Sequence, residues 1–122
     1  MIKYIFHLSD IHIRNGDEKY SRYYEYKNVF ESLFISIKNN INKKNLSYNE
    51  ALIIITGDIF HNKNNIGNYG LMLYKILIEN LTKLALTIIL EGNHDSLQNE
   101  IEQPSLVTST FGIDNLILAN VP

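Results

Sequence analysis

The segment Ala-Leu-Ile-Ile-Ile-Thr-Gly-Asp-Ile-Phe-His at residues 51–61 decides the fold. Its first five residues form a continuous apolar run, which Thr56 and Gly57 end. A short apolar run of this kind is typical of a central parallel strand, because such strands are buried on both faces. Polar side chains follow at once, and ligands of parallel α/β sheets bind at the carboxyl ends of the strands.

The rest of the chain repeats this arrangement. Apolar and β-branched runs predict further strands over residues 3–8, 86–90 and 115–119. Apolar residues recur at helical spacing over residues 23–41 and about 68–84, and Pro104 can begin a short helix that reaches residue 111. The polar segment 39–50 is predicted to be a loop. The resulting order, βαβαβαβ, predicts an α/β fold with a parallel sheet flanked by helices.

Length and composition limit the class of protein. The chain has 122 residues, enough for a single domain, and 45% of them are hydrophobic. A net charge of −2 excludes a generally basic nucleic-acid-binding surface, so any DNA contact must be local. The absence of cysteine excludes disulfides, thiolate metal sites and a cysteine nucleophile. No apolar run approaches the ~18 residues of a membrane span, and the amino terminus lacks a signal-peptide core. We therefore expect an intracellular protein with no membrane partner, in the cytoplasm or nucleus, or in a host cell if the gene is viral.

Three polar clusters follow three of the predicted strands. They are Ser9-Asp10-Ile11-His12, Gly57-Asp58-Ile59-Phe60-His61 and Gly92-Asn93-His94-Asp95. The carboxyl ends of parallel strands share one edge of the sheet, so we expect the three clusters to lie on the same rim. Mixed oxygen and nitrogen donors suit Mn²⁺, Fe²⁺ or Zn²⁺ better than Ca²⁺.

The residue types fit a site for two metal ions. Asp10 and His12 can bend toward one ion, Asp58 can bridge two, and Asn93 offers a carbonyl oxygen to the second. Two ions ~3.5–4 Å apart can activate a water molecule and hold a phosphoryl group for in-line attack. His94 can then stabilise the developing charge or protonate the leaving oxygen.

Each cluster also has a purely structural interpretation. Gly-Asp and Gly-Asn are ordinary turn dipeptides after a strand. Asp95 can cap the next segment or hold His94 in place, and His7 fits a structural role inside its strand. The occurrence of three such turns in order, each at a strand end, favours the metal site.

The same residues resemble the calcineurin-like metallophosphoesterases, whose pattern is Asp-x-His, Gly-Asp and then Gly-Asn-His-(Asp/Glu). The matching residues are Asp10 and His12, Gly57-Asp58, and Gly92-Asn93-His94-Asp95. The resemblance implies that Asp10, His12 and Asp58 ligate one metal, that Asp58 and Asn93 ligate the other, and that His94 is catalytic.

A narrower resemblance concerns the DNA double-strand-break-repair nucleases of the SbcD/meiotic-recombination-eleven family. It rests on His-Leu-Ser-Asp-Ile-His at 7–12, Gly-Asp-Ile-Phe-His at 57–61 and Gly-Asn-His-Asp at 92–95. It implies a Mn²⁺-dependent DNA exonuclease or endonuclease in which His61 assists catalysis near the substrate phosphate. It also implies a coiled-coil ATPase partner of the SbcC type and a homodimer. The wide apolar surface of the predicted helix 68–84 agrees with a dimer helix, and equally with a buried one.

The chain departs from the pattern of these relatives in two places. Arg14 stands where they usually carry glycine, and it either contacts phosphate or faces solvent. They also supply further ligands from a later His and a terminal Gly-His-x-His, which this chain lacks. We therefore expect residues 1–122 to be the amino-terminal part of a phosphoesterase domain, half of its two-sheet sandwich, with an incomplete site.

Two other functions stay open at this stage. The acidic net charge and the lack of a basic run favour a metallophosphoesterase that acts on phosphoproteins, nucleotides or small phosphodiesters. The incomplete ligand set is also compatible with a catalytically inactive interaction module. Lys19, Arg22 and Lys63 flank the predicted site and either touch a phosphate backbone or are solvated loop charges.

Overall fold

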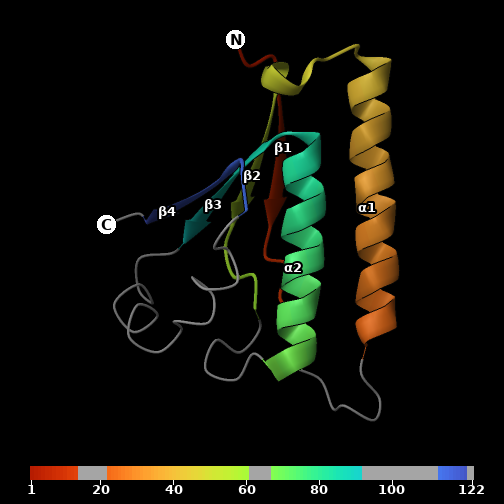
Figure 1. Cartoon of the computed structure of the whole chain (residues 1–122), viewed down its shortest axis with the longest axis vertical. Helices are drawn as coiled ribbons and strands as arrows, with labels where there is room; N and C mark the ends of the chain where they lie inside the picture. Colours follow the sequence, from red (N-terminus) through yellow and green to blue (C-terminus); the bar gives the residue numbers. More distant parts are fainter. Residues whose placement is uncertain (14–21, 61–66, 92–112, 121–122) are drawn as a thin grey trace.

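The computed structural model describes residues 1–13, 22–60, 67–91 and 113–120, and Figure 1 shows the arrangement of their helices and strands. The elements are β1 (Tyr4–Ser9), α1 (Tyr23–Lys43), the 3-10 helix η2 (Tyr48–Glu50), β2 (Ala51–Thr56), α2 (Gly67–Leu84), β3 (Leu86–Glu91) and β4 (Leu116–Asn120). Each predicted strand and both long predicted helices are present. The helix predicted to begin at Pro104 lies outside the described residues.

The four strands form one parallel sheet in the order β1-β2-β3-β4. The α1 helix connects β1 to β2 and α2 connects β2 to β3, so each connection moves one strand further in the same direction. Because such crossovers keep one hand, both helices lie on the same face of the sheet, where Figure 1 shows them side by side. The fold class predicted from the sequence, a parallel α/β sheet with flanking helices, is therefore confirmed.

The core lies between β2 and α2. Ala51, Ile53 and Ile55 are fully buried, whereas the alternating residues Leu52 and Ile54 are only half-buried. The continuous apolar run predicts a central parallel strand, and β2 lies between β1 and β3 as predicted. Within the described residues, the helices cover the face that carries Ala51, Ile53 and Ile55. From α2, the core receives Leu73, Tyr74, Leu77, Ile78 and Leu81.

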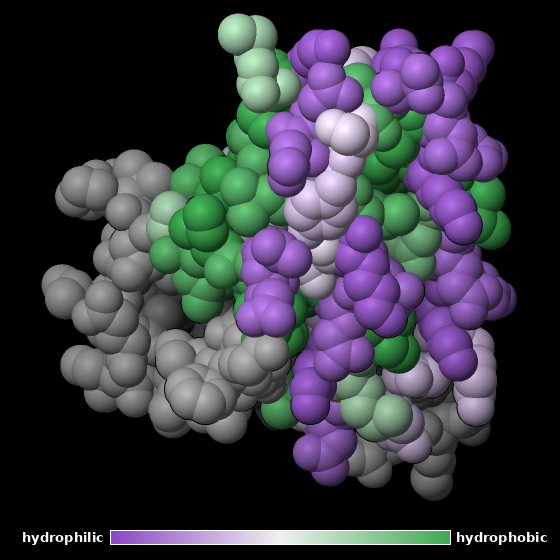
Figure 2. Space-filling model, turned by 45° about the horizontal axis from the view of Figure 1, so that its top comes forward, coloured by the Kyte–Doolittle hydropathy of each residue, from purple (hydrophilic) through white to green (hydrophobic). Residues whose placement is uncertain are grey.

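The other face of the sheet is apolar and partly open. Ile5 on the edge strand β1 is 53% exposed, and Ile117 on the opposite edge strand β4 is 46% exposed. In Figure 2, hydrophobic residues gather on the left, on the sheet side of the molecule, and hydrophilic residues predominate on the right, over the helices. Exposed apolar surface of this kind is typical of a sheet face that a further layer or a partner covers.

Much of the apolar surface of α2 is used inside the fold. Seven of its residues are buried against the sheet and α1, namely Gly70, Leu73, Tyr74, Leu77, Ile78, Leu81 and Thr82. Tyr69 and Met72 remain 43% and 48% exposed. The width of the apolar surface, which suggested a dimer helix, is thus largely explained by packing within the chain. In the described part of the chain, neither helix combines the length and the apolar character of a membrane span.

The segment between α1 and β2 is more ordered than expected. Residues 39–50 were predicted to be a loop, but α1 continues to Lys43 and a 3-10 turn covers Tyr48–Glu50. Asn40 explains part of this difference, because its side chain donates to the carbonyl of Ser36 one turn earlier and so stays compatible with the helix. Ser47 and Glu50 then form a capping box that begins the 3-10 turn.

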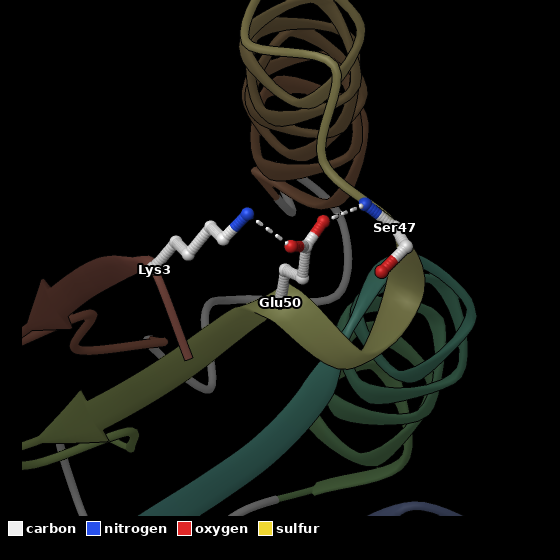
Figure 3. Close-up of polar contacts among 3 residues, drawn as sticks. All are labelled: Lys3, Ser47 and Glu50. Atoms are coloured by element: carbon white, nitrogen blue, oxygen red, sulfur yellow. Dashed lines mark hydrogen bonds and ion pairs between the residues drawn. The ribbon is translucent and has the colours of Figure 1, made fainter. Parts of the chain in front are cut away.

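Glu50 joins this turn to the start of β1. One carboxylate oxygen lies 2.6 Å from Lys3 Nζ, and the other accepts a hydrogen bond of 2.9 Å from the backbone N–H of Ser47, as Figure 3 shows. The backbone N–H of Lys3 also donates to the carbonyl of Glu50, at 2.7 Å. The pKa of Glu50 is lowered to about 2, mainly by the hydrogen bond from the Lys3 side chain and next by the hydrogen bond from the backbone of Ser47. The carboxylate thus ties the first residues of the chain to the turn before β2.

These contacts predict a pH dependence of stability. The folded-state pKa of Glu50 lies below its ordinary value of 4.5, so its contribution is complete above about pH 4.5 and is lost as the pH falls toward 2. We expect Glu50→Gln to lower the melting temperature at pH 7, and the difference from wild type to shrink between pH 4.5 and 2. Thermal unfolding by circular dichroism across this range measures both effects. Glu31→Gln, at an exposed position on α1, is the matched control and is expected to show no such convergence. If the melting temperature of Glu50→Gln lies below that of wild type by the same amount at every pH, the ionised Glu50 carboxylate does not stabilise the fold through these contacts.

Candidate metal centre

The turns that follow β1 and β2 lie against each other. The backbone N–H of Asp10 donates to the carbonyl of Thr56 at 3.1 Å. Gly57 has a φ of +75°, and a Cβ atom there would overlap Asp10 Oδ1 and lie 2.9 Å from Asp10 Cγ. The carboxylate of Asp10 therefore rests directly on the backbone of the second turn, and only glycine leaves room for it.

Two further backbone hydrogen bonds continue this pairing beyond the strands. The N–H of His12 donates to the carbonyl of Asp58 at 3.0 Å, and the N–H of Ile13 donates to that of Ile59 at 2.6 Å. Ile13 and Phe60 form a parallel bridge, and both side chains are buried. The two polar turns are thus held together at each end, by the sheet before them and by this bridge after them.

Asp10 and His12 both have left-handed backbone conformations, each with a φ of 52°. This region costs a residue other than glycine about 1–2 kcal/mol, and such strain is concentrated at functional sites. Asn45 and Asn115 also have a positive φ, which asparagine tolerates more readily, whereas Asp10 and His12 are two of the metal ligands predicted from the sequence. Their conformation turns the chain sharply as it leaves the sheet.

The turn brings the two side chains close together. Asp10 Oδ1 lies 3.7 Å from His12 Nε2, and the side chains are 65% and 41% exposed. A carboxylate oxygen and an imidazole nitrogen at this separation, both accessible from solvent, fit a divalent transition metal ion between them. The donor set on the first turn is therefore chemically suited to the ion predicted for it.

Asp58 lies in the neighbouring turn and is half-buried. Its backbone carbonyl accepts the hydrogen bond from His12, so its position relative to the first turn is fixed. Within residues 1–13, 22–60, 67–91 and 113–120, no three His, Asp or Glu side chains gather closely enough to hold a metal ion. Asp10 and His12 form a pair, and Asp58 stands beside them without closing a three-ligand group.

The remaining predicted site residues lie outside the described residues. They are Arg14, His61, Asn93, His94 and Asp95. Their assignment continues to rest on the sequence. His61 directly follows the bridge residue Phe60, and Asn93 comes two residues after Glu91, the last residue of β3.

Two residues that sequence reasoning did not identify support the first two turns. Thr56 accepts the hydrogen bond from Asp10 through its carbonyl, and its Oγ1 lies 2.8 Å from His7 Nε2. Tyr26 on α1 donates from its hydroxyl to the carbonyl of His12 at 3.0 Å. The contact of His7 agrees with the structural role expected for it. Its pairing with Thr56 follows the strand register, because Ser9 pairs with Thr56 and His7 is two residues earlier on the same face. No sequence signal identifies Tyr26.

A divalent ion held by Asp10, His12 and Asp58 would polarise a phosphoryl oxygen and lower the pKa of water. The backbone hydrogen bonds between the two turns hold Asp10 and His12 beside Asp58 at the rim of the sheet, and the side chains of Asp10 and His12 are accessible from solvent.

Comparison with known proteins shows the family of the chain. The profile of the calcineurin-like phosphoesterases matches residues 3–121. An uncharacterized protein of Acanthamoeba polyphaga mimivirus is 34% identical over 119 residues, which cover 94% of this chain and 8% of that protein. The chain therefore spans less than a tenth of the length of this relative. No solved structure matches at a significant level.

Calcineurin-like phosphoesterases are metal-dependent hydrolases that generally bind two divalent ions, and the paired turns at the carboxyl ends of β1 and β2 carry the ligand types that this chemistry requires. From its sequence profile over residues 3–121, this chain belongs to the calcineurin-like phosphoesterase family.

Proposed function

We propose that this chain is the amino-terminal part of a nuclease domain that hydrolyses phosphodiester bonds in DNA with the aid of Mn²⁺. Asp10, His12 and Asp58 are assigned to one ion, and Asp58 and Asn93 to the second. His94 and His61 are assigned to catalysis at the phosphate. Asp95 and Arg14 are assigned to positions beside the ligands or the substrate.

The observation that carries this proposal is the contact between the first two polar turns. Because the carboxylate of Asp10 lies on Gly57 and the N–H of His12 is bonded to the carbonyl of Asp58, residues 46 or more positions apart in sequence meet at one rim. Backbone hydrogen bonds hold the two turns against each other. A metal site needs ligands carried by a well-fixed backbone, and these bonds support that role for Asp10, His12 and Asp58.

The choice of DNA as the substrate rests on the sequence of the second turn. Phe60 and His61 follow Gly57-Asp58 as they do in the repair nucleases that this chain resembles. The structure supports a structural role for Phe60. Its side chain is buried, and its ring centroid lies 5.6 Å from that of Tyr74 on α2. Burial of Phe60 and its bridge to Ile13 fix the end of the second turn within the described residues.

The same resemblance suggests two partners, a coiled-coil ATPase of the SbcC type and a second copy of the chain. The proposed dimer contact lies on α2 between residues 68 and 84. Tyr69 and Met72 are the exposed apolar residues of that helix, since most of its apolar surface is packed inside the fold. A dimer through α2 would therefore use the amino-terminal half of the helix.

The first test is the dependence of Mn²⁺ binding on Asp58. We expect Asp58→Asn to weaken Mn²⁺ binding at least tenfold, because the amide keeps the shape of the side chain but removes the charge that the ion requires. Isothermal titration calorimetry on the 122-residue chain measures this. Asp114→Asn, at an exposed position before β4, is the matched control and is expected to bind Mn²⁺ like wild type. Equal affinity in wild type and Asp58→Asn would refute the metal assignment.

A second candidate function is the hydrolysis of phosphoproteins, nucleotides or small phosphodiesters by the same site. The net charge of −2 favours it, because this charge is unfavourable for a DNA-binding surface. Assays of a longer protein that includes this chain separate the two. Cleavage of linear DNA supports the nuclease, whereas turnover of a chromogenic phosphomonoester without DNA cleavage supports the alternative.

A further inference from the structure

The hydroxyl of Tyr26 reaches from helix α1 to the first metal-binding turn. It donates a hydrogen bond of 3.0 Å to the carbonyl of His12, fourteen residues earlier in the chain. The ring of Tyr26 packs beside that of Phe30, one turn further along α1, with 6.2 Å between the ring centroids. Phe30 is buried in the core. Tyr26 lies in the first turns of the helix, where its N–H donates to the carbonyl of Arg22 at 2.9 Å. The hydroxyl is therefore presented by a side chain fixed at both its backbone and its ring.

His12 is held on both sides of its α-carbon. Its N–H is bonded to the carbonyl of Asp58 and its own carbonyl accepts from Tyr26. Between these two bonds the backbone has the left-handed φ of 52°, which is unfavourable for histidine and persists only when surrounding contacts impose it. The direction of the imidazole depends on this backbone conformation, because it determines where the Cβ atom points.

We propose that Tyr26 is a positioning residue for the ligand His12, and that it couples helix α1 to the metal site. This inference rests on the proposed function, since it gives Tyr26 a role only if His12 binds the ion. Partners that hold a metal ligand in place commonly change affinity by 10- to 100-fold when they are removed. Tyr26 differs from the usual case because it holds the backbone of the ligand rather than its ring.

The test is the substitution Tyr26→Phe, which removes the hydroxyl and keeps the ring and its packing on Phe30. We expect Mn²⁺ affinity to fall about tenfold, with a melting temperature close to that of wild type. Free Mn²⁺, followed by electron paramagnetic resonance during titration, gives the affinity. Pulsed resonance on the bound ion reports the nitrogen coupling of the imidazole, which we expect to weaken. A purely structural role would lower the melting temperature and leave this coupling unchanged.

The matched control is Tyr24→Phe, two residues earlier on the same helix, where the side chain is 73% exposed. It removes the same hydroxyl and is expected to leave both Mn²⁺ affinity and the nitrogen coupling as in wild type. Wild-type behaviour of Tyr26→Phe in both measurements overturns the role of Tyr26, provided that Asp58→Asn still loses Mn²⁺. If the wild-type chain itself does not bind Mn²⁺, or if Asp58→Asn binds it equally well, the proposed metal site fails and the role of Tyr26 fails with it.

Discussion

Replacing Gly57 with alanine is expected to weaken Mn²⁺ binding about tenfold or more and to lower the free energy of unfolding by about 1–3 kcal/mol. Two separate effects produce this result. The φ of +75° costs alanine about 1–2 kcal/mol relative to glycine. The added methyl group would also occupy the space of Asp10 Oδ1, and Asp10 can move because its side chain is 65% exposed. The carboxylate is thus expected to rotate away from His12, so the metal site loses a ligand.

Gly67→Ala separates these two effects. Gly67 also has a φ of +75°, at the start of α2, where no predicted ligand stands. The variant Gly67→Ala is expected to lose a similar amount of unfolding free energy, because alanine is strained at this φ, and to keep the Mn²⁺ affinity of wild type. Urea unfolding and calorimetric titration on both variants give the comparison. If the two variants lose the same stability and neither changes Mn²⁺ affinity, the contact between Asp10 and Gly57 has no part in the site.

The fold could be predicted from the sequence because each element has its own local signal. The apolar run that ends at Thr56 and Gly57 predicts β2 to within one residue, and the helical spacing predicts α1 to within two residues of its end. The prediction failed at residues 39–50, where a high content of Asn and Lys was interpreted as a loop. The bond from Asn40 to Ser36 and the capping box of Ser47 and Glu50 turn the same polar residues into helix and 3-10 turn.

The site could be predicted in part, for a different reason. Ligand residues share a motif because metal chemistry restricts their type and spacing, so Asp10, His12 and Asp58 are visible in the sequence. Tyr26 is not, because any residue that presents a donor to the carbonyl of His12 would serve, and its distance from that carbonyl depends on how α1 packs. The strain at Asp10 and His12 was equally invisible, since aspartate and histidine adopt a left-handed φ only occasionally and their presence in a sequence does not predict it.

Replacing Leu77 with alanine is expected to cost about 2–5 kcal/mol of unfolding free energy, the largest effect on stability that we predict. Leu77 is fully buried near the middle of α2 and belongs to the hydrophobic core. Removing its branched end loses the transfer free energy of the missing atoms and leaves a cavity that the neighbouring core residues close only partly. Leucine and alanine have similar helix propensities, so the helix itself is not weakened. Urea unfolding followed by circular dichroism measures the loss.

Met72→Ala, five residues earlier on α2, is the matched control and also tests the proposed dimer. Met72 is 48% exposed, so in a monomer its truncation is expected to change stability by less than about 1 kcal/mol. In a dimer through the amino-terminal half of α2, Met72 would be covered by the second copy. Its truncation would then lower stability in a way that depends on protein concentration, because only the associated state loses the contact. Light scattering at the same concentrations shows which case holds. A small effect of Leu77→Ala, in contrast, would mean that α2 does not pack on the sheet, and the assignment of its apolar surface to the core would be wrong.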